Sequence, residues 1–316
     1  MGKLFLTFDC EDFINPRSTV ALYSILKLLD KYNLRGIFFL TGHVCQKLTD
    51  FPKILELLEK HEIGYHGSSH SVHPTICEYT DVDDYDTAVR ISLERETAQI
   101  NPLTGVKEGK GGFLLLRYLF PNNQILSFRA PGFCWSPPHL EALQKLGIKF
   151  DFSAKISSAP VCYRNITFYP YPIGAHKHDS LTYVRAVYKS LLPYCYAVLL
   201  KHPHNLVNRY WDSIYYNGNP KRLCMVNLKS PKETRNLLRS YELFFKRISS
   251  LSERGFIEVT PPLQEGSEIR FTKKQVLRCY RESIKWVSRF GYKPKFILRH
   301  FTEYFNIKLD AEKLAA

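Results

Sequence analysis

Short apolar runs alternate with amphipathic segments at the start of this chain, and this order restricts the fold more than any other feature. Leu4–Phe8, Arg35–Leu40 and Glu62–Tyr65 have the length and composition of buried strands. Between them, Ser18–Tyr32 and Pro52–His61 carry apolar residues at helical spacing. Because each connection contains a helix, we expect the strands to lie parallel in one sheet with right-handed crossovers. The chain is therefore predicted to be an α/β protein.

The alternation continues along most of the chain. Further strands are predicted at Gln124–Phe128, Ile148–Phe152, Ile166–Tyr171, Tyr196–Leu200 and Phe256–Thr260. Helices are predicted at Val82–Ile100, Pro138–Leu146, Leu181–Leu192 and Pro231–Leu251, with a loop at Asn101–Gly112. About eight strands that alternate with helices over roughly 260 residues favour a TIM-like barrel over an open sheet.

The alternation ends at Pro261-Pro262, so residues 1–262 are predicted to form the barrel. Beyond it, Thr272 and Gln275 have the spacing of a capping box, and a second helix is expected from Pro294. Residues 263–316 are therefore predicted to be a basic helical extension packed on the barrel. A membrane or partner role for its apolar stripes is the alternative.

Composition limits the partners and the setting. The formal charge of +14 is compatible with an anionic membrane surface, a phosphate-bearing substrate or nucleic acid. Zinc-finger spacing and an RNP-like aromatic motif are absent from the sequence, so no specific nucleic-acid binding is predicted. The eight cysteines include no C-x-x-C pair. With no long apolar run and no signal-peptide pattern, we expect a cytoplasmic protein. The sequence does not indicate an oligomeric state.

Three carboxylates follow the first strand directly: Asp9, Glu11 and Asp12. A strand that delivers acidic groups to its C-terminal tip is typical of α/β enzymes. A strand that simply runs into a polar loop would look the same, so these residues need partners elsewhere in the chain.

Histidines supply such partners at the end of the third strand, where His66, His70 and His73 lie close together in the sequence. Gly67 and Pro74 favour a turn, which could direct His66 and His70 to one metal ion. A surface cluster of histidines is the alternative. Two histidines and one carboxylate form a common catalytic zinc set with an open position for water, and the carboxylates of the first strand are expected at the same barrel end.

Three later strands also end in polar residues. Arg129 follows the fourth strand and could pair with a carboxylate and keep it ionised. Asp151 stands at the end of the fifth strand, and His202 and His204 follow the apolar run before Lys201. Each residue alone is weak support for a site, but five such clusters in barrel order are strong support.

These clusters resemble the motifs of the polysaccharide deacetylase family, the NodB-homology domain of carbohydrate esterase family 4, in its branch with an F-D-x-E-D first motif. The matching segments run from Leu4 to Thr260 and are Thr7–Asp12, His66–His70, Arg129–Phe133, Asp151–Ser153 and His202-Pro203. The resemblance implies a distorted, commonly seven-stranded barrel that hydrolyses an N-acetyl group of an amino sugar or glycoconjugate. It also implies a divalent metal, most readily Zn²⁺ with Co²⁺ or Fe²⁺ as alternatives, and a metal-bound water as the nucleophile.

The resemblance also assigns roles to residues. Asp9 is expected to be the base and His202 the acid, with Arg129 holding Asp9 and Asp151 tuning His202. The expected metal ligands are His66, His70 and Glu11, with Asp12 as the alternative third ligand. The substrate-binding candidates are His73, Pro131, Phe133 and His204.

The sequence leaves three other functions open. A cyclic amide or imide hydrolase would use the same residues, and a catalytically silent saccharide-binding barrel would keep only the fold. The base, metal and acid set counts against the silent barrel. A nucleic-acid-associated protein would rest only on the Lys and Arg content.

Overall fold

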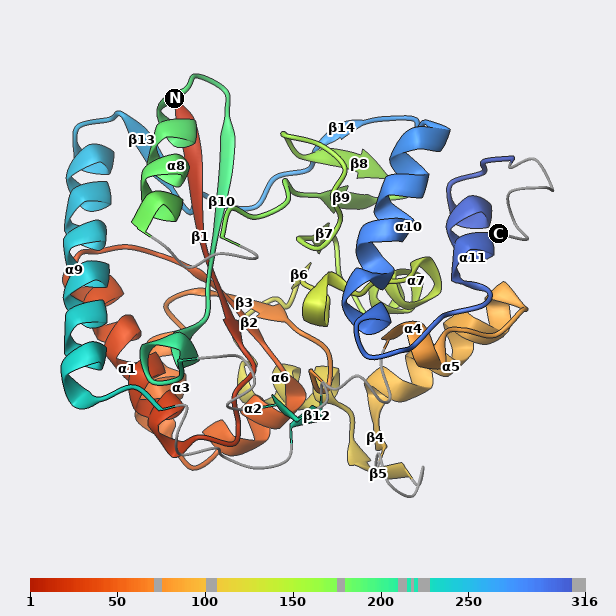
Figure 1. Cartoon of the computed structure of the whole chain (residues 1–316), viewed down its shortest axis with the longest axis horizontal. Coiled ribbons are helices and arrows are strands. Elements are labelled where there is room, and N and C mark those ends of the chain that lie inside the picture. Colours follow the sequence, from red (N-terminus) through yellow and green to blue (C-terminus); the bar gives the residue numbers. More distant parts are fainter. Residues whose placement is uncertain are drawn as a thin grey trace.

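The computed structural model describes residues 1–70, 76–100, 107–174, 180–209, 215–216, 219–220 and 228–308. Within this part of the chain, seven parallel strands follow one another around a curled sheet, in the order β10 (Tyr196–Lys201), β1 (Gly2–Cys10), β2 (Ile37–Leu40), β3 (Glu62–Tyr65), β6 (Ser127–Phe128), β7 (Phe150–Asp151) and β9 (Ile166–Phe168). Ile173, beyond β9, bridges Leu199 of β10 and joins the two ends of the sheet. The predicted α/β barrel-like fold is confirmed, in its seven-stranded form (Figure 1).

The last predicted strand lies outside this ring. β13 (Ile257–Val259) pairs with Gly2–Leu4 of β1, whereas β2 pairs with Thr7–Cys10 of the same strand. Because β10 occupies the other edge of β1 from Lys3 to Phe8, β13 and β2 share one edge at different heights. β8 (Val161–Tyr163) is antiparallel to β9, and β14 (Ser267–Glu268) pairs with β8. Neither β8 nor β14 was expected from the sequence.

Helices connect and cover these strands. They are α1 (Pro16–Lys31), α2 (Gly42–Leu48), α3 (Pro52–Leu58), α4 (Ile76–Tyr79), α5 (Tyr85–Thr97), α6 (Gly112–Leu119), α7 (Pro137–Lys145), α8 (Ser180–Leu191), α9 (Pro231–Glu253), α10 (Lys273–Ser288) and α11 (Ile297–Tyr304), with short 3-10 turns η1 (Pro131–Phe133) and η2 (Pro203–Leu206). Two small hairpins pair β4 (Ala98–Ile100) with β5 (Lys107–Lys110) and β11 (Tyr215–Tyr216) with β12 (Asn219–Pro220). None of the helices in the described ranges has the length and apolar character that a membrane-spanning helix requires.

Two sequence predictions about the segment before α6 are wrong. The helix predicted to reach Ile100 ends at Thr97 because Ala98 already has extended backbone dihedrals and pairs with Lys110. The predicted loop at Asn101–Gly112 contains the strand Lys107–Lys110, while residues 101–106 lie outside the described residues. The glycine and charged residues of Lys107–Lys110 favoured a loop, but pairing with Ala98–Ile100 in a hairpin makes this segment a strand.

Alternation along β1 divides its side chains between two cores. Leu4, Leu6 and Phe8 belong to the large apolar cluster between the strands and the helices. Phe5 belongs to a second cluster inside the barrel, mostly aromatic, together with Ile37, Phe39, Phe150, Phe152, Tyr169 and Val198. Since side chains two residues apart share a face, Thr7 and Asp9 follow Phe5 into the barrel.

The C-terminal helices pack against the opposite side of the barrel from α9 (Figure 1). The predicted capping box of α10 is present, with Thr272 and Gln275 each accepting from the backbone N–H of the other. Val276 and Phe301 are fully buried, and the Phe301 ring lies 4.8 Å from that of Trp135 on the barrel. In the described part of the chain, α10 and α11 thus complete the apolar core.

Candidate metal centre

An ion pair between Asp9 and Arg129 lies inside the barrel, next to the aromatic cluster. Arg129 Nη1 donates to Asp9 Oδ1 at 2.7 Å and to Thr7 Oγ1 at 2.9 Å. The guanidinium is fully buried and lies 4.4 Å from the centre of the Phe39 ring. The pair compensates two charges that the fold has removed from water, and it fixes the orientation of the Asp9 carboxylate. The strand ends predicted that Arg129 pairs with a carboxylate, and the family resemblance implied Asp9 as that carboxylate.

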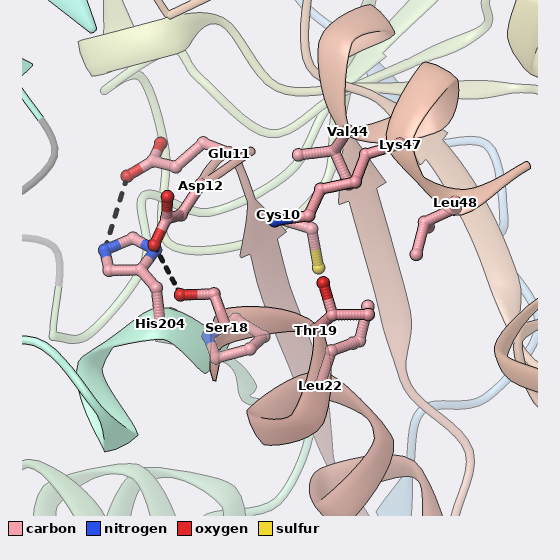
Figure 2. A pocket seen from close by; sticks show the side chains of 11 residues that line it. Cys10, Glu11, Asp12, Ser18, Thr19, Leu22, Val44, Lys47, Leu48 and His204 are labelled. Carbon is pink, nitrogen blue, oxygen red and sulfur yellow. Dashed lines mark hydrogen bonds and ion pairs between the residues drawn. The ribbon is translucent and has the colours of Figure 1, made fainter. Parts of the chain in front are cut away.

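The two acidic residues that follow β1 point in different directions (Figure 2). Asp12 accepts hydrogen bonds from the backbone N–H groups of Ile14 and Asn15, the Ser18 hydroxyl and the Asn208 amide. These donors hold Asp12 at the start of α1. Glu11 turns instead toward His204, whose Nε2 lies 3.7 Å from Glu11 Oε1. Glu11, Asp12 and His204 line a cavity of about 20 Å³, which has room for about one water molecule.

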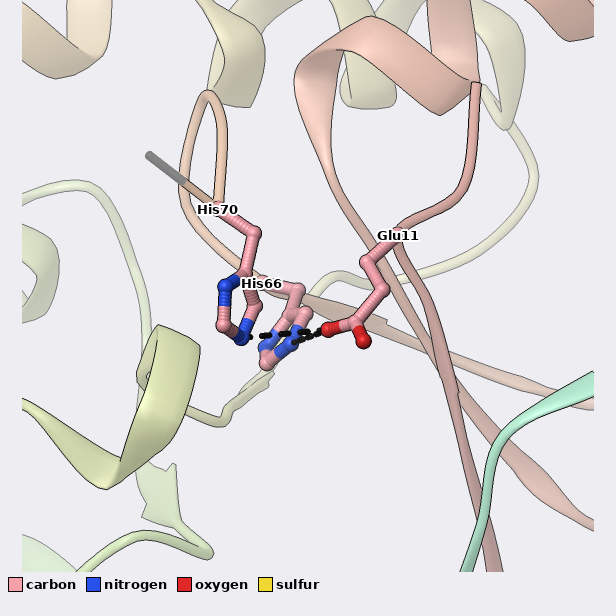
Figure 3. A group of neighbouring side chains, drawn as sticks. All are labelled: Glu11, His66 and His70. Carbon is pink, nitrogen blue, oxygen red and sulfur yellow. Dashed lines mark hydrogen bonds and ion pairs between the residues drawn. The ribbon is translucent and has the colours of Figure 1, made fainter. Parts of the chain in front are cut away.

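Glu11, His66 and His70 converge on one point (Figure 3). Glu11 Oε2 lies 3.3 Å from His66 Nε2 and 3.1 Å from His70 Nε2. One ligand atom from each residue falls within 4.8 Å of the others, and all three residues are buried. They come from the ends of β1 and β3, the two neighbours of β2 in the sheet, and their side chains meet across the end of β2. The geometry selects Glu11 and leaves Asp12 out of this cluster.

Hydrogen bonds reach both imidazoles, and the bond to His66 leaves the lone pair of its Nε2 toward Glu11. His66 Nδ1 lies 2.6 Å from the carbonyl oxygen of Arg129, which can only accept, so Nδ1 carries the hydrogen. The backbone N–H of Gly132 donates to His70 Nε2 at 3.0 Å. The Nε2 lone pair of His66 and the carboxylate of Glu11 face each other at 3.3 Å, and they repel unless a positive charge lies between them. This donor set fits a divalent cation, and the carbonyl contact to His66 is the usual second shell of a metal-bound histidine.

The electrostatics of the cluster agree with this fit. Burial raises the pKa of Glu11, but His70, His66 and the two histidines after β10 outweigh it and hold that pKa well below its usual range. For the imidazole of His66, burial acts to lower the pKa. The negative charges of Asp9 and Glu11 outweigh this effect, so the pKa of His66 is raised. Among the described residues, buried Glu11 Oε1 has no hydrogen-bond partner. The cluster therefore favours a positive charge near the carboxylates.

His202 comes to the same cluster from the end of β10. Its Nε2 lies 3.9 Å from Asp9 Oδ2 and 3.9 Å from Glu11 Oε1. Burial lowers the pKa of His202 to about 4, against the opposing effect of the charges on Glu11 and Asp9. β10 lies beside β1 in the ring, so its end delivers His202 and His204 to the side of Glu11 away from β3.

Asp151 organises the neighbouring backbone. Its Oδ1 accepts from the N–H groups of Ser153 and Ala154, both at 2.9 Å, and its Oδ2 accepts from the Ser153 hydroxyl at 2.8 Å. That hydroxyl oxygen in turn accepts from the N–H of Ala130 at 2.8 Å. Asp151 thus supports the segment that carries Arg129. Burial raises the pKa of Asp151 to about 6 despite these donors.

The other substrate-binding candidates have packing contacts or fall outside the structure. Pro131 is buried over Gly67, where an added Cβ would lie 3.1 Å from Pro131 Cγ. Phe133 is also buried, with its ring 4.7 Å from that of Tyr171. His73 lies outside the described residues.

Sequence reasoning missed Trp286, on α10, whose ring centre lies 4.8 Å from that of His70. Trp286 lies at the edge of the buried face of that helix, seven residues after Cys279 and three after Ser283, and packs partly buried against the apolar core. This helical spacing is the signal that could have marked it.

Comparisons with known proteins agree with this geometry. The family model described as polysaccharide deacetylase matches residues 2–108. The first third of the chain is thus similar to polysaccharide deacetylases. The match contains Asp9, Glu11, His66 and His70, and it ends before Arg129, Asp151 and His202. No curated protein matches the sequence.

Solved structures extend the likeness beyond this region. A 4-alpha-glucanotransferase from Thermococcus litoralis is 11% identical with a TM-score of 0.51, covering 94% of this chain and 48% of that chain. A putative polysaccharide deacetylase from Mycobacterium smegmatis is 13% identical with a TM-score of 0.45, covering 83% and 93%. A CE4 family pseudoenzyme from Bacillus anthracis is 12% identical with a TM-score of 0.40, covering 85% and 64%, so this chain spans less than two thirds of that protein. At these identities the likeness concerns the fold.

Proposed function

We propose that this protein is a metal-dependent hydrolase that removes an N-acetyl or related acyl group from an amino sugar or a glycoconjugate. The observation that carries the proposal is the convergence of Glu11, His66 and His70 at the barrel end where Asp9 also lies. The family match supports the reaction class, because it spans all four of these residues.

Zn²⁺ is the proposed cation, with Co²⁺ and Fe²⁺ as alternatives, since two imidazoles and one carboxylate suit these ions better than Mg²⁺ or Ca²⁺. Such a cation, held by Glu11, His66 and His70, supplies Lewis acidity toward the carbonyl oxygen of an amide.

Asp9 is the proposed base. Arg129 occupies its Oδ1, so its Oδ2 is the oxygen that faces the cluster, 3.8 Å from His66 Nε2. From this position Oδ2 can accept the proton of an attacking water. Arg129 keeps the carboxylate in this orientation by hydrogen bonding to one oxygen only.

His202 is the proposed acid. Its Nε2 lies 3.9 Å from Asp9 Oδ2, on the side of the cluster opposite His70 and β3. Burial lowers the pKa of this imidazole to about 4, so His202 is neutral before the reaction and has to receive the proton that it then donates to the departing amine. A tuning role for Asp151 stays a prediction, because the observed partners of its carboxylate are Ser153 and Ala154.

An anionic group on the substrate or its carrier belongs to the same proposal. A surface groove of about 590 Å³ on α10 is lined by one acidic side chain, Glu282, and by four cationic ones: Lys273, Lys274, Arg278 and Arg281. Together with the net charge of +14, this groove supports contact with phosphate groups of a lipid surface or a conjugate. Sedimentation with anionic liposomes at low salt tests the lipid source, and a soluble phosphate-bearing sugar that competes would favour the conjugate.

The central test measures metal and product together. Metal content would be determined by elemental analysis of wild type and of the His66→Ala/His70→Ala variant, with acetate release from a panel of N-acetyl sugars. We expect near-stoichiometric metal in the wild type alone and acetate release by the wild type alone. Asp9→Asn should keep the metal and lose about 10²–10⁴-fold in rate.

His61→Gln is the matched control, because His61 precedes β3 at the opposite end from His66 and is also buried. It should retain both metal and activity. Metal without acetate release would redirect the substrate search to cyclic amides and imides. Wild type that takes up no Zn²⁺, Co²⁺ or Fe²⁺ after reconstitution would overturn the proposal and leave a saccharide-binding barrel.

A further inference from the structure

Helix α10, in the C-terminal extension, places the indole ring of Trp286 directly against one of the candidate metal ligands, His70. The rings of Trp286 and His70 have centres 4.8 Å apart and planes at 81°, an edge-to-face contact. Trp286 is partly exposed, whereas His70 is buried. The chain brings these residues together across more than two hundred positions of sequence, so the contact depends on the docking of the extension.

The same indole also covers the peptide group that touches the ligand atom. Gly132 has φ +58°, and a Cβ added to it would lie 2.5 Å from Trp286 Cδ2. The N–H of Gly132 donates to His70 Nε2, the atom that lies 3.1 Å from Glu11 Oε2. Trp286 therefore contacts His70 through its ring and packs on the residue that holds Nε2. A glycine is required at position 132 because a side chain would occupy the space of the indole.

Contacts between α10 and the barrel determine where the indole ring of Trp286 lies. Cys279 and Val287 are fully buried on α10, and Glu282 pairs with Lys155 of the barrel at 3.5 Å. After the helix, the Tyr292 hydroxyl donates to Asp81 Oδ2 at 3.1 Å. Contacts on both sides of Trp286 thus tie α10 to the barrel and, with the helix, the position of the indole.

We propose that Trp286 is a positioning residue of the metal centre, which fixes the ring of His70 so that Nε2 faces Glu11. All three ligands belong to the barrel, but the orientation of His70 then depends on the docking of the extension. This inference rests on the proposed metal site. Outer contacts that orient a histidine ligand typically contribute 10–100-fold to metal affinity.

The test compares Co²⁺ affinity, measured by competition with a chromophoric chelator, in wild type, Trp286→Ala and Trp286→Phe. We expect Trp286→Ala to weaken binding about 10–100-fold and Trp286→Phe to recover most of the loss, because a smaller aromatic ring can still pack on His70. In the wild type, Co²⁺ should quench indole fluorescence at stoichiometric addition, and Trp286→Phe should remove most of that quenching.

Val276→Ala on the same helix separates positioning from docking, because Val276 is fully buried and belongs to the apolar stripe of α10. Equal weakening of Co²⁺ binding by Val276→Ala and Trp286→Ala, at equal loss of thermal stability, would show a general docking effect and overturn the inference. Unchanged Co²⁺ affinity in Trp286→Ala would also overturn it. Wild type without Co²⁺ binding would refute the metal centre itself, a failure distinct from both.

Discussion

Arg129 Nη1 lies 2.7 Å from Asp9 Oδ1, and both side chains are buried within the barrel. Removal of one partner leaves the other charge in a site that excludes water. We therefore expect Arg129→Met to lower the free energy of unfolding by about 3–5 kcal/mol, measured by urea denaturation. The double variant Arg129→Met/Asp9→Asn should recover part of this loss. If the double variant is as unstable as the sum of the single variants, the two charges do not compensate each other.

Glu11 and Asp12 can be separated by their different partners. Asp12→Asn removes a charge that accepts several hydrogen bonds at the start of α1, so it should cost about 1.5–3 kcal/mol in unfolding free energy with metal content unchanged. Glu11→Gln should lose metal, measured by elemental analysis, with a smaller change in stability of the metal-free protein. The reverse pattern would make Asp12 the third ligand.

Glu62 gives a pH dependence of stability that is separate from the metal centre. Burial raises the pKa of Glu62 to about 7, although Arg35 acts against this. Because the folded state then binds more protons than the unfolded state between about pH 4.5 and 7, this residue lowers stability as the pH rises through that range.

Comparison of Glu62→Gln with wild type isolates this effect from other titrating groups. At pH 8 the variant should exceed wild type by about 1–3 kcal/mol in unfolding free energy, and at pH 4.5 the difference should nearly vanish. A difference that does not depend on pH would show that Glu62 ionises at its ordinary pKa in the fold.

If the proposed residues bind the metal, its removal should destabilise the protein through them. At a free Zn²⁺ concentration 100 times the dissociation constant, the folded state should gain about 2.7 kcal/mol, read as a rise in Tm over the chelator-treated protein. The His66→Ala/His70→Ala variant should show no such rise. A similar rise in that variant would indicate that zinc binds elsewhere.

We expect the barrel to need residues 263–316 in order to fold into a soluble, stable protein. Truncation after Pro262 would uncover Trp135, whose ring packs against Phe301, and would remove the buried side chains of Val276 and Val287. We expect the truncated chain to be insoluble or to unfold without a cooperative transition, followed by circular dichroism. A soluble truncated barrel with a sharp thermal transition would show that residues 1–262 fold independently.

The sequence was most informative about positions along the strands. The strands predicted around Leu4–Phe8, Arg35–Leu40 and Tyr196–Leu200 were found with small shifts at their ends, because apolar runs of this length need burial on both faces. A carboxylate partner for Arg129 was also predictable, since parallel strands bring their carboxyl ends to one edge, and the family resemblance implied Asp9. The hairpin strand at Lys107–Lys110 was not, because its glycine and three charged residues are not typical of a strand.

What the sequence by itself determined is the α/β order of elements and the residue types at the strand ends. Only the tertiary structure decided that Glu11 joins the histidines while Asp12 binds α1, that Asp151 serves the backbone beside Arg129, and that Trp286 supports His70. Local periodicity and strand-end composition come from each segment's own burial pattern. The choice between neighbouring carboxylates depends instead on donors and rings from distant elements, which the order of residues does not bring together until the chain has packed.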